Sequence, residues 1–384
     1  MSKEAAATVE QLDSLAGVEA SQWDALAGSQ PFLRHAFLRA LETSGCVGGA
    51  SGWLPMHLVL RRQGRLEGAL PLYLKHDSYG EFVFDWSWAR AFAARWGRSY
   101  YPKLVSAVPF TPVTGPRLMG EATQRQRLLE GALGLARALG VSSWHCLFPS
   151  PQQAEELAQA GLLLRRGIQL HWHNEGYASF DHFLAALSRE RRKKIRQERR
   201  RLFESGVRFE WRSGNEIRET DWHFFNRCYR HTYREHGSTP YLNLEFFLEL
   251  GRQLSEACLL VLAYRGDKPI AAALNLFDGE ALYGRYWGSL EFVPGLHFET
   301  CYYQGIAFCI ERGLARFEGG AGGEHKLPRG FVPTTTWSAH WFADEDFAGF
   351  IKGVLAEEAG QVARVMGALK AHAPFCRGAE GDEH

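Results

Sequence analysis

The chain contains one apolar pattern twice, and this repeat constrains its fold more than any other feature. The stretches HLVLRRQGRLEGALPLYL (57–74) and LLVLAYRGDKPIAAALNLF (259–277) each read as an apolar strand, a short turn with a glycine, and a second apolar strand. This order is typical of a β-hairpin. The repetition of such a unit predicts two related sheet-and-helix domains in tandem.

The segments after the two hairpins are also expected to correspond. Each half continues with an aromatic strand, a loop that contains proline, a helix that ends at glycine, and a short strand. The seam falls near residues 170–185, which predicts an N-terminal domain at 1–170 and a C-terminal domain at 171–384. The expected fold class is α+β, each domain being a mainly antiparallel sheet flanked by helices. The expected aromatic strands are 81–88 and 281–288, the helices 123–140 and 298–313, and the short strands 142–148 and 315–320.

Composition limits what such a pair of domains could do. The 44 basic and 43 acidic residues are nearly balanced, which excludes a protein that coats nucleic acid with its whole surface. No segment resembles a signal peptide or approaches the roughly 18 apolar residues of a membrane helix, so we expect a soluble, cytoplasmic protein. The seven cysteines form no C-x-x-C pair, and the histidines have no metal-site spacing, so no disulfide framework and no metal are expected.

The basic charge is concentrated in SRERRKKIRQERRR (188–201), which opens the second domain. At helical spacing, Arg191 falls on the same stripe as Leu187 and Ile195, whereas most of the other basic residues point elsewhere. An inward guanidinium needs a carboxylate, a carbonyl or a phosphate as partner. We therefore predict that Arg191 and Lys194 bind an anionic group of the substrate. The alternatives are a solvated helix face and a surface for a nucleic-acid backbone.

A second group of polar residues lies in 295–342, on a helix and on the glycine-rich turn that follows it. Their chemistry suits acyl transfer, because a histidine or carboxylate can take a proton from an attacking amine while cations or loop amides stabilise the oxyanion. The alternative is a tight loop with surface charge. We predict Glu299, Glu324 and His325 as catalytic residues, and His297, Tyr302, Tyr303, Gln304, Lys326 and Arg329 as substrate-binding residues.

Several phrases, above all LHFETCYYQGI (296–306) and GGEHKLPRGFVPTTTWSAHWF (322–342), resemble the FemAB-like peptidoglycan biosynthesis/recognition family of the GNAT acyltransferase superfamily. The resemblance runs from about residue 20 to about residue 370. It implies tandem GNAT-like domains that transfer an aminoacyl group from an aminoacyl-tRNA to an amine of a peptidoglycan precursor. It also implies that the basic run meets the phosphates of that precursor or of the tRNA.

One departure bears on the acyl donor. GNAT enzymes that use acetyl-CoA hold its pyrophosphate on a Q/R-x-x-G-x-G/A loop at a helix start. The corresponding stretches FTPVTGPRLMGEATQ (110–124) and SLEFVPGLHFETC (289–301) do not match it. The first hypothesis is therefore a Fem-type acyltransferase that uses aminoacyl-tRNA or another activated acyl donor, acyl-CoA included, and no further cofactor. An acetyl-CoA-dependent N-acetyltransferase is the second. A non-catalytic module that recognises a cell-wall precursor or nucleic acid is the third.

Overall fold

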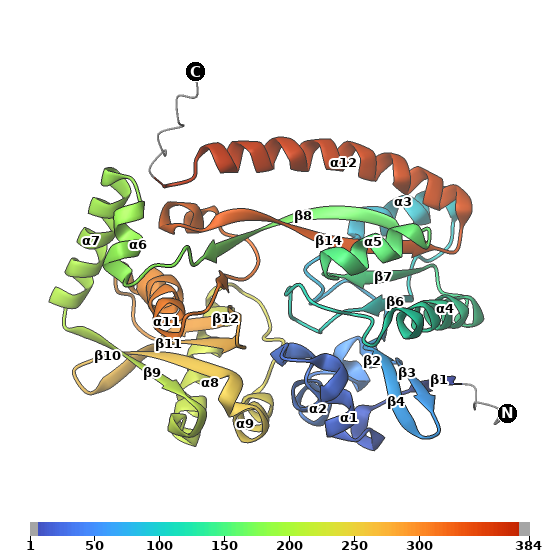
Figure 1. Ribbon diagram of the computed structural model, residues 1–384, viewed down its shortest axis with the longest axis horizontal. Helices are drawn as coiled ribbons and strands as arrows, with labels where there is room; N and C mark the ends of the chain where they lie inside the picture. The colour runs from blue at the N-terminus through green and yellow to red at the C-terminus, as the bar shows by residue number, and fades with distance from the viewer. Residues whose placement is uncertain (1–6, 376–384) are drawn as a thin grey trace. The chain divides into compact units, whose positions relative to one another are not determined.

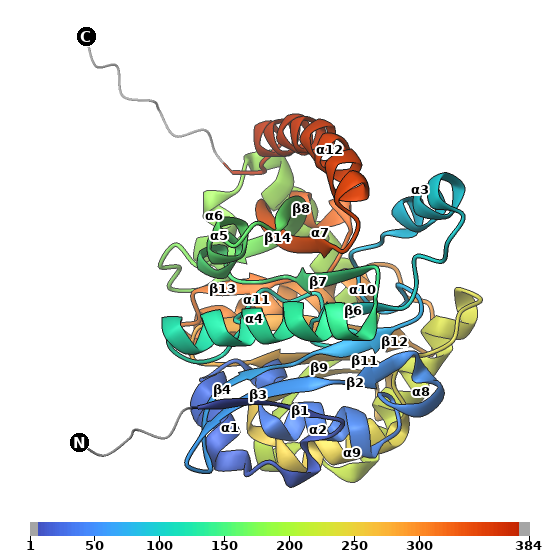
Figure 2. The same ribbon diagram turned by 90° about the vertical axis from the view of Figure 1, so that its right-hand side faces the viewer.

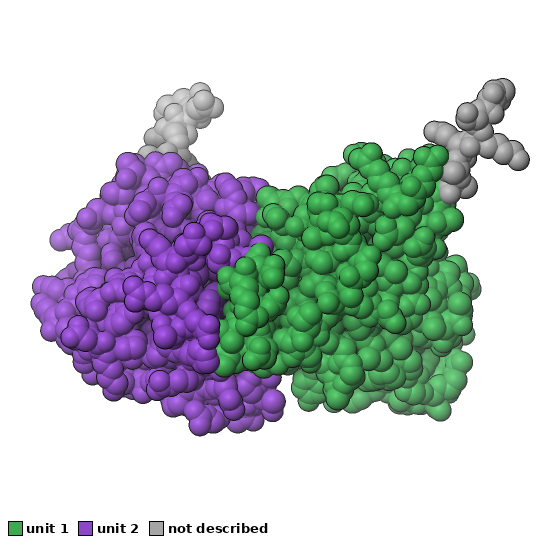
Figure 3. Space-filling view, turned by 90° about the horizontal axis from the view of Figure 1, so that it is seen from below, with its two compact units in different colours: residues 1–167, 241–253, 335–363 green, residues 168–240, 254–334, 364–384 purple. Residues whose placement is uncertain are grey.

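The computed structural model describes residues 7–375, which form two compact units of mixed α-helix and β-strand. Unit 1 comprises residues 1–167, 241–253 and 335–363, and unit 2 comprises residues 168–240, 254–334 and 364–384 (Figure 3). The first boundary falls three residues before the expected division at 170. Two later segments nevertheless belong to unit 1, so neither unit is a continuous stretch of chain.

Unit 1 begins with a small antiparallel sheet of strand order β1-β3-β4. β3 and β4 form the first predicted hairpin. Its turn contains Gln63 and Gly64, both with positive φ (51° and 79°), as the tight turn of a twisted hairpin requires. The elements are β1 (Thr8–Leu12), α1 (Ala20–Ala27), α2 (His35–Thr43), β3 (His57–Arg62) and β4 (Arg65–Leu70).

The other strands of unit 1 follow one another in the order β2-β5-β6-β7-β14. β6 and β7 are parallel, and α4 makes the crossover between them (Figure 1). The apolar side of α4 packs on this pair, where Leu128 and Trp144 are fully buried. The elements are β2 (Trp53–Pro55), β5 (Tyr73–Lys75), α3 (Trp86–Trp96), β6 (Lys103–Ser106), α4 (Ala122–Leu139), β7 (Ser143–Leu147), α5 (Pro151–Gln159), α9 (Leu244–Gln253) and the end of β14 (Val332–Phe342).

The strands of unit 2 follow one another in the order β8-β13-β12-β11-β10-β9, and among them only β12 and β13 pair in parallel. α8 lies so close to β12 that a Cβ at Gly288 would stand 2.0 Å from the carbonyl oxygen of Cys228, which only glycine permits. The elements are the end of β8 (Leu163–His173), α6 (Phe180–Ala186), α7 (Arg189–Glu204), β9 (Val207–Ser213), α8 (Glu219–Glu235), β10 (Cys258–Arg265), β11 (Lys268–Phe277), β12 (Ala281–Ser289), α10 (Leu296–Phe298), a π-helix (Glu299–Tyr303), α11 (Gln304–Arg312) and β13 (Arg316–Glu318).

The two units repeat the same sequence of elements. Each has an edge strand (β1 or β9), a helix or helix pair, an antiparallel hairpin (β3–β4 or β10–β11), and a parallel strand pair joined by a helix (β6–α4–β7 or β12–α11–β13). Both predicted hairpins are therefore confirmed. The aromatic strand expected at 81–88 is wrong, because this stretch is a loop followed by the first turns of α3. Phe84 and Trp86 alternate as in a strand, but their side chains face solvent at 42% and 45% exposure.

The apolar residues of 347–370 recur at helical spacing, which predicts an amphipathic helix at the C-terminal end of the second domain. The structure has the long helix α12 (Glu345–Ala371) there, and its apolar stripe is buried in the first half and half-buried in the second, where Leu369 packs against the core of unit 2. In the first half Phe347 and Ile351 are buried against aromatic side chains of unit 1, whereas Val365, further along, is 49% exposed. Of the cysteines, the six within the described residues are free thiols, and Cys376 lies outside the described residues. None of the helices in the described part of the chain has the length and apolarity required to cross a membrane.

Candidate active site

The predicted site residues of unit 2 centre on a π-helix between β12 and α11. Leu296–Phe298 form one α-helical turn, Glu299–Tyr303 widen into a π-helix, and Gln304 opens α11. Such widened turns are rare and occur often at functional sites, because the extra residue re-aims the neighbouring side chains. α10, the π-helix and the first residue of α11 carry the predicted His297, Glu299, Tyr302, Tyr303 and Gln304.

Glu299 is 1% exposed, and both oxygens of its carboxylate accept hydrogen bonds. Arg199 of α7 donates to it from Nε and Nη2 at 2.9 Å, and Gln304 donates from Nε2 at 2.8 Å. Helical spacing places Arg199 among the basic residues that point away from the apolar stripe, for which a solvated face is one alternative. In the structure Arg199 instead reaches the buried carboxylate, which needs a cation. This bidentate pair fixes α7 against the π-helix.

Glu198, the neighbour of Arg199, makes a second connection to the site. Its carboxylate accepts a hydrogen bond from the Tyr303 hydroxyl at 3.0 Å and lies 3.4 Å from Nη2 of Arg329. Arg329 is 6% exposed, and its guanidinium stands 3.4 Å from the centroid of the Phe298 ring, as in a cation–π contact. Its Nε has no hydrogen-bond partner among the described residues. This buried cation therefore keeps one N–H donor unused.

Two histidines and a tyrosine gather beside Arg329. A hydrogen bond of 2.8 Å joins His325 Nε2 to the Tyr302 hydroxyl, and the rings of His297 and His325 lie 5.6 Å apart. Burial, with the nearby charges of His325 and Arg329, lowers the pKa of His297 to about 4. Burial and the Lys326 charge lower the pKa of His325 as well. Both imidazoles are therefore neutral near pH 7 and can accept a proton.

Lys326 holds the glycine-rich turn together. The residue is 2% exposed, and its ammonium group donates to the carbonyl oxygens of Gly320 and Gly322 at 2.7 and 2.6 Å. Burial disfavours the charged form and lowers the pKa of Lys326 to about 8. Two of its three N–H donors are engaged in this way, so its structural role in the turn is clear.

A pocket opens next to these residues at the loop between β12 and α10. It has a volume of about 380 Å³ and is lined by His231 and Glu235 of α8, by Trp287 and Ser289 of β12, and by residues 290–298 of the loop and α10. His297 is part of this lining, and its ring lies 4.7 Å from that of Trp287. The pocket is thus mainly apolar, with a neutral imidazole in its wall.

Three predicted residues are not bonded into this group. The side chains of Arg191, Lys194 and Glu324 form no hydrogen bond or ion pair with other described residues, and none of them lines the pocket. On α7 a different set of basic side chains surrounds a shallow hollow of about 470 Å³. These are Arg189, Arg192, Lys193, Arg196 and Arg200, with Gln197.

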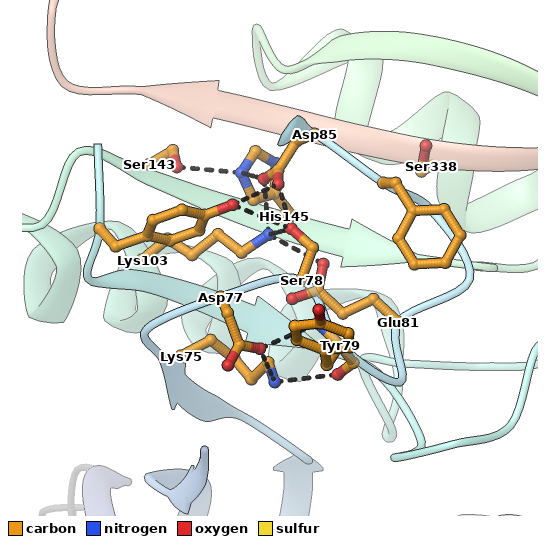
Figure 4. Close-up of polar contacts among 12 residues, drawn as sticks. Lys75, Asp77, Ser78, Tyr79, Glu81, Asp85, Lys103, Ser143, His145 and Ser338 are labelled. Atoms are coloured by element: carbon orange, nitrogen blue, oxygen red, sulfur yellow. Dashed lines mark hydrogen bonds and ion pairs between the residues drawn. The ribbon is translucent and has the colours of Figure 1, made fainter. Parts of the chain in front are cut away.

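Unit 1 contains a buried ionic network that the sequence analysis did not identify (Figure 4). The Lys103 ammonium, fully buried on β6, donates to Asp85 at 2.5 Å, to Glu81 at 2.8 Å and to Ser78 at 3.2 Å. Burial raises the pKa of Glu81 to about 7 despite the Lys103 charge. Burial alone would also raise the pKa of Asp85. The charge of Lys103 and its hydrogen bond to Asp85 outweigh that effect, so the pKa of the Asp85 carboxyl is lowered.

Aromatic and histidine side chains extend the network. The Tyr100 hydroxyl is 3.1 Å from Asp85 and 2.8 Å from His145 Nε2, and the Nδ1 atoms of His145 and His340 are 2.5 Å apart. All these residues, with Lys103, are at most 3% exposed, so the network is closed to substrates. The signal in the sequence was a polar residue inside an apolar strand, Lys103 in KLVS and His145 in SWHCL.

No set of three histidine, cysteine, aspartate or glutamate side chains in residues 7–375 could hold a metal ion. The comparisons with known proteins concern the whole fold. The FemAB-like family model, described as peptidoglycan biosynthesis/recognition, matches residues 14–377. No curated protein matches the chain significantly.

Solved structures share the fold at low sequence identity. The crystal structure of FemX is 13% identical and superposes with a TM-score of 0.55, over 89% of this chain and 100% of that one. The C-terminal domain of a protein described as a "putative lysylphosphatidylglycerol synthetase" from Agrobacterium fabrum is 10% identical. Its TM-score is 0.53, over 88% of this chain and 96% of that one.

The predicted α+β class and the predicted likeness to Fem-type proteins are thus confirmed. The protein belongs to the FemAB-like family.

Proposed function

We propose that the protein is an N-acyltransferase of the Fem type, which transfers an acyl or aminoacyl group from an activated donor to an amine. The observation that carries this proposal is the pocket at the β12–α10 loop, because His297 lines it and His325 and Tyr302 adjoin that histidine. An apolar pocket with a few convergent polar groups is typical of a small-molecule or acyl-group site.

An amine must lose a proton when it attacks an acyl carbon, and His325 suits the role of proton acceptor. Its Nε2–H donates to the Tyr302 oxygen in this scheme, which leaves the Nδ1 lone pair for the amine. The positive charge of Arg329 favours the oxyanion, with Lys326 positioning the turn. The bond between the acyl carbon and the donor oxygen then breaks, and that oxygen leaves with the proton returned by His325. Glu299 acts as a positioning residue, since Arg199 and Gln304 occupy its oxygens.

We propose aminoacyl-tRNA as the donor in preference to acyl-CoA. The loop that would hold a pyrophosphate contains Pro294, which has no N–H to donate. The basic hollow on α7 suits the phosphates of a tRNA backbone, because such contacts need charge and not sequence. This donor would place the reaction in the cytoplasm. The proposed acceptor is an amine, and this proposal includes the amine of a peptidoglycan precursor peptide.

The test is a transfer assay with a pool of labelled aminoacyl-tRNAs and precursor peptides, in which labelled peptide is measured with and without ribonuclease. We expect His325→Ala to lower kcat by about 100-fold or more, the usual range for a lost general base. His223→Ala is the matched control, because His223 lies half-exposed on α8, outside the lining of the pocket.

Three outcomes would contradict the proposal. Equal transfer by wild type and His325→Ala would remove His325 from the chemistry. Transfer from acetyl-CoA alone would favour the acetyltransferase alternative. Tight binding of precursor or RNA without transfer from any donor would favour a non-catalytic recognition module.

A further inference from the structure

Helix α8 contributes two polar side chains, His231 and Glu235, to the wall of the pocket at the β12–α10 loop. The hydroxyl of Thr232 donates to the Trp287 carbonyl at 3.2 Å, which holds this end of α8 against β12 (Figure 2 shows both elements). Both polar side chains therefore have a fixed backbone beneath them. The apolar part of the lining consists of Trp287, Leu290, Phe292, Val293, Pro294, Leu296 and Phe298.

His231 and Glu235 present two hydrogen-bond acceptors to a ligand. His231 Nδ1 lies 3.7 Å from Glu235 Oε2, too far for a hydrogen bond, and it is buried with no hydrogen-bond partner among the described residues. In the tautomer that carries its proton on Nε2, this nitrogen is an acceptor. Two acceptors at this spacing can both lie about 2.9 Å from one nitrogen placed between them. The pair therefore suits a ligand nitrogen with at least two N–H donors, such as an ammonium group.

The charges in the lining also favour a cation at this point. Glu235 and Glu291 both line the pocket, but the Glu291 carboxylate already accepts hydrogen bonds from Arg265 and Lys268 at 3.0 and 2.7 Å. No lysine or arginine in the described part of the chain pairs with Glu235, and none stands in the lining. Glu235 therefore attracts an ammonium group and repels a carboxylate or a phosphate.

The rest of the pocket suits a bulky apolar group. Its volume of about 380 Å³ is near the lower end of the range for ligand pockets, roughly 300 to 1,000 Å³, so it holds one residue-sized group and not a whole peptide or nucleotide. Phe292 lines it and is 93% exposed, so an apolar ligand that covers this ring gains free energy. Arg329, which is outside the lining, stands 3.4 Å from the Phe298 ring centroid, and there the proposed reaction develops its negative charge.

We propose that this pocket binds an aminoacyl group with a bulky apolar side chain, and that His231 and Glu235 select it by its α-ammonium group. The inference rests on the proposed transfer function and specifies its donor. The acceptor amine fits this position less well, because a carboxylate stabilises the charged form of an amine that must lose its proton to react. The α-amino group of the transferred residue takes no part in the reaction and stays charged.

The test is a titration of the full chain, labelled with 5-fluorotryptophan, with L-phenylalaninamide, glycinamide and 3-phenylpropionamide. The fluorine resonance that is missing from Trp287→Phe reports on the pocket. Phenylalaninamide should shift this resonance with a Kd at least about tenfold below that of glycinamide, which lacks the apolar group. Its Kd should be about five- to tenfold below that of 3-phenylpropionamide, which lacks the ammonium group.

Glu235→Gln should raise the Kd of phenylalaninamide by about five- to tenfold and leave that of 3-phenylpropionamide unchanged. Glu219→Gln is the matched control, because Glu219 also lies 3.7 Å from a histidine of α8, His223, but does not line the pocket. Equal effects of the two substitutions would overturn the proposal. So would equal affinity for phenylalaninamide and 3-phenylpropionamide, or a Trp287 resonance that phenylalaninamide does not move.

Transfer kinetics separate this inference from the proposed function. In an active enzyme, Glu235→Gln should raise KM for phenylalanyl-tRNA and leave KM for the acceptor unchanged. A higher KM for the acceptor alone would assign the pocket to the acceptor and overturn the donor assignment. If no donor supports transfer, the proposed function fails, while the fluorine titration still decides whether the pocket selects an apolar group with an ammonium.

Discussion

The guanidinium of Arg199 and the carboxylate of Glu299 form a bidentate ion pair between residues one hundred positions apart in the chain. Glu299 is 1% exposed, whereas the Arg199 side chain retains 23% exposure and covers the carboxylate from the solvent side. The pair joins the basic helix α7 to the π-helix, so part of the charge that the basic run concentrates is structural.

Replacing Arg199 by alanine should destabilise unit 2 strongly. The substitution leaves the buried Glu299 carboxylate without its cation, and breaking a buried pair in this way typically costs about 3 to 5 kcal/mol. The measurement is the free energy of unfolding by urea. Arg200→Ala is the matched control, because Arg200 is 69% exposed and its pair with Glu204 is worth at most about 1 kcal/mol. Equal effects of the two substitutions would contradict a structural role for the Arg199 pair.

The sequence indicated the local elements of the fold because their signals are local. Hairpin turns, helix ends at Gly140 and Gly313, and apolar periodicity depend on neighbouring residues, and these predictions agree with the structure. The same reasoning gave a wrong prediction for the segment 81–88. Its alternating aromatics imitate a strand, but the loop conformation depends on Lys103, which lies in a later strand.

For the site, too, contacts between residues close in the sequence were predictable, whereas contacts between distant segments were not. The π-helix and the glycine-rich turn were identified as one region, and the structure brings His297, Tyr302 and His325 together there. Helical periodicity could not tell that Arg199 reaches a carboxylate on another element while Arg191 does not. That choice depends on how α7 packs, which no short-range pattern encodes.

The two halves of α12 should differ in their contribution to stability. Ile351 is fully buried against the aromatic cluster of unit 1, so Ile351→Ala should cost about 2 to 5 kcal/mol through lost transfer free energy and a cavity. Val365 is 49% exposed, and Val365→Ala should change stability by about 0.5 kcal/mol or less. Thermal unfolding of the two variants checks this. A larger effect at Val365 would contradict the packing described for this helix.

Lys326 should titrate well below an ordinary lysine. Burial lowers its pKa to about 8, and its ammonium group donates to two turn carbonyls. In a protein labelled at the lysine ε-carbons, one resonance should titrate near pH 8. This resonance should be missing from Lys326→Met, in which the amides of the turn at 319–323 should also exchange faster with deuterium. A Lys326 resonance that titrates only above pH 10 would show that the side chain is solvated.

Glu81 should make the stability of unit 1 depend on pH in a defined direction. Burial raises its pKa from 4.5 to about 7 in the folded protein, so between these values the folded state binds more protons than the unfolded state. The free energy of unfolding must then fall as pH rises through this window. Glu81→Gln keeps the shape of the side chain but cannot ionise, so the variant should lose this part of the pH dependence.

The groups that face Glu81 are Lys103, Lys75 and Asp85, and all three remain in the variant. The measurement is the unfolding free energy at several pH values between 4.5 and 7, for wild type and variant side by side. Parallel curves would mean that Glu81 stays ionised throughout, and that Lys103 pairs with two charged carboxylates.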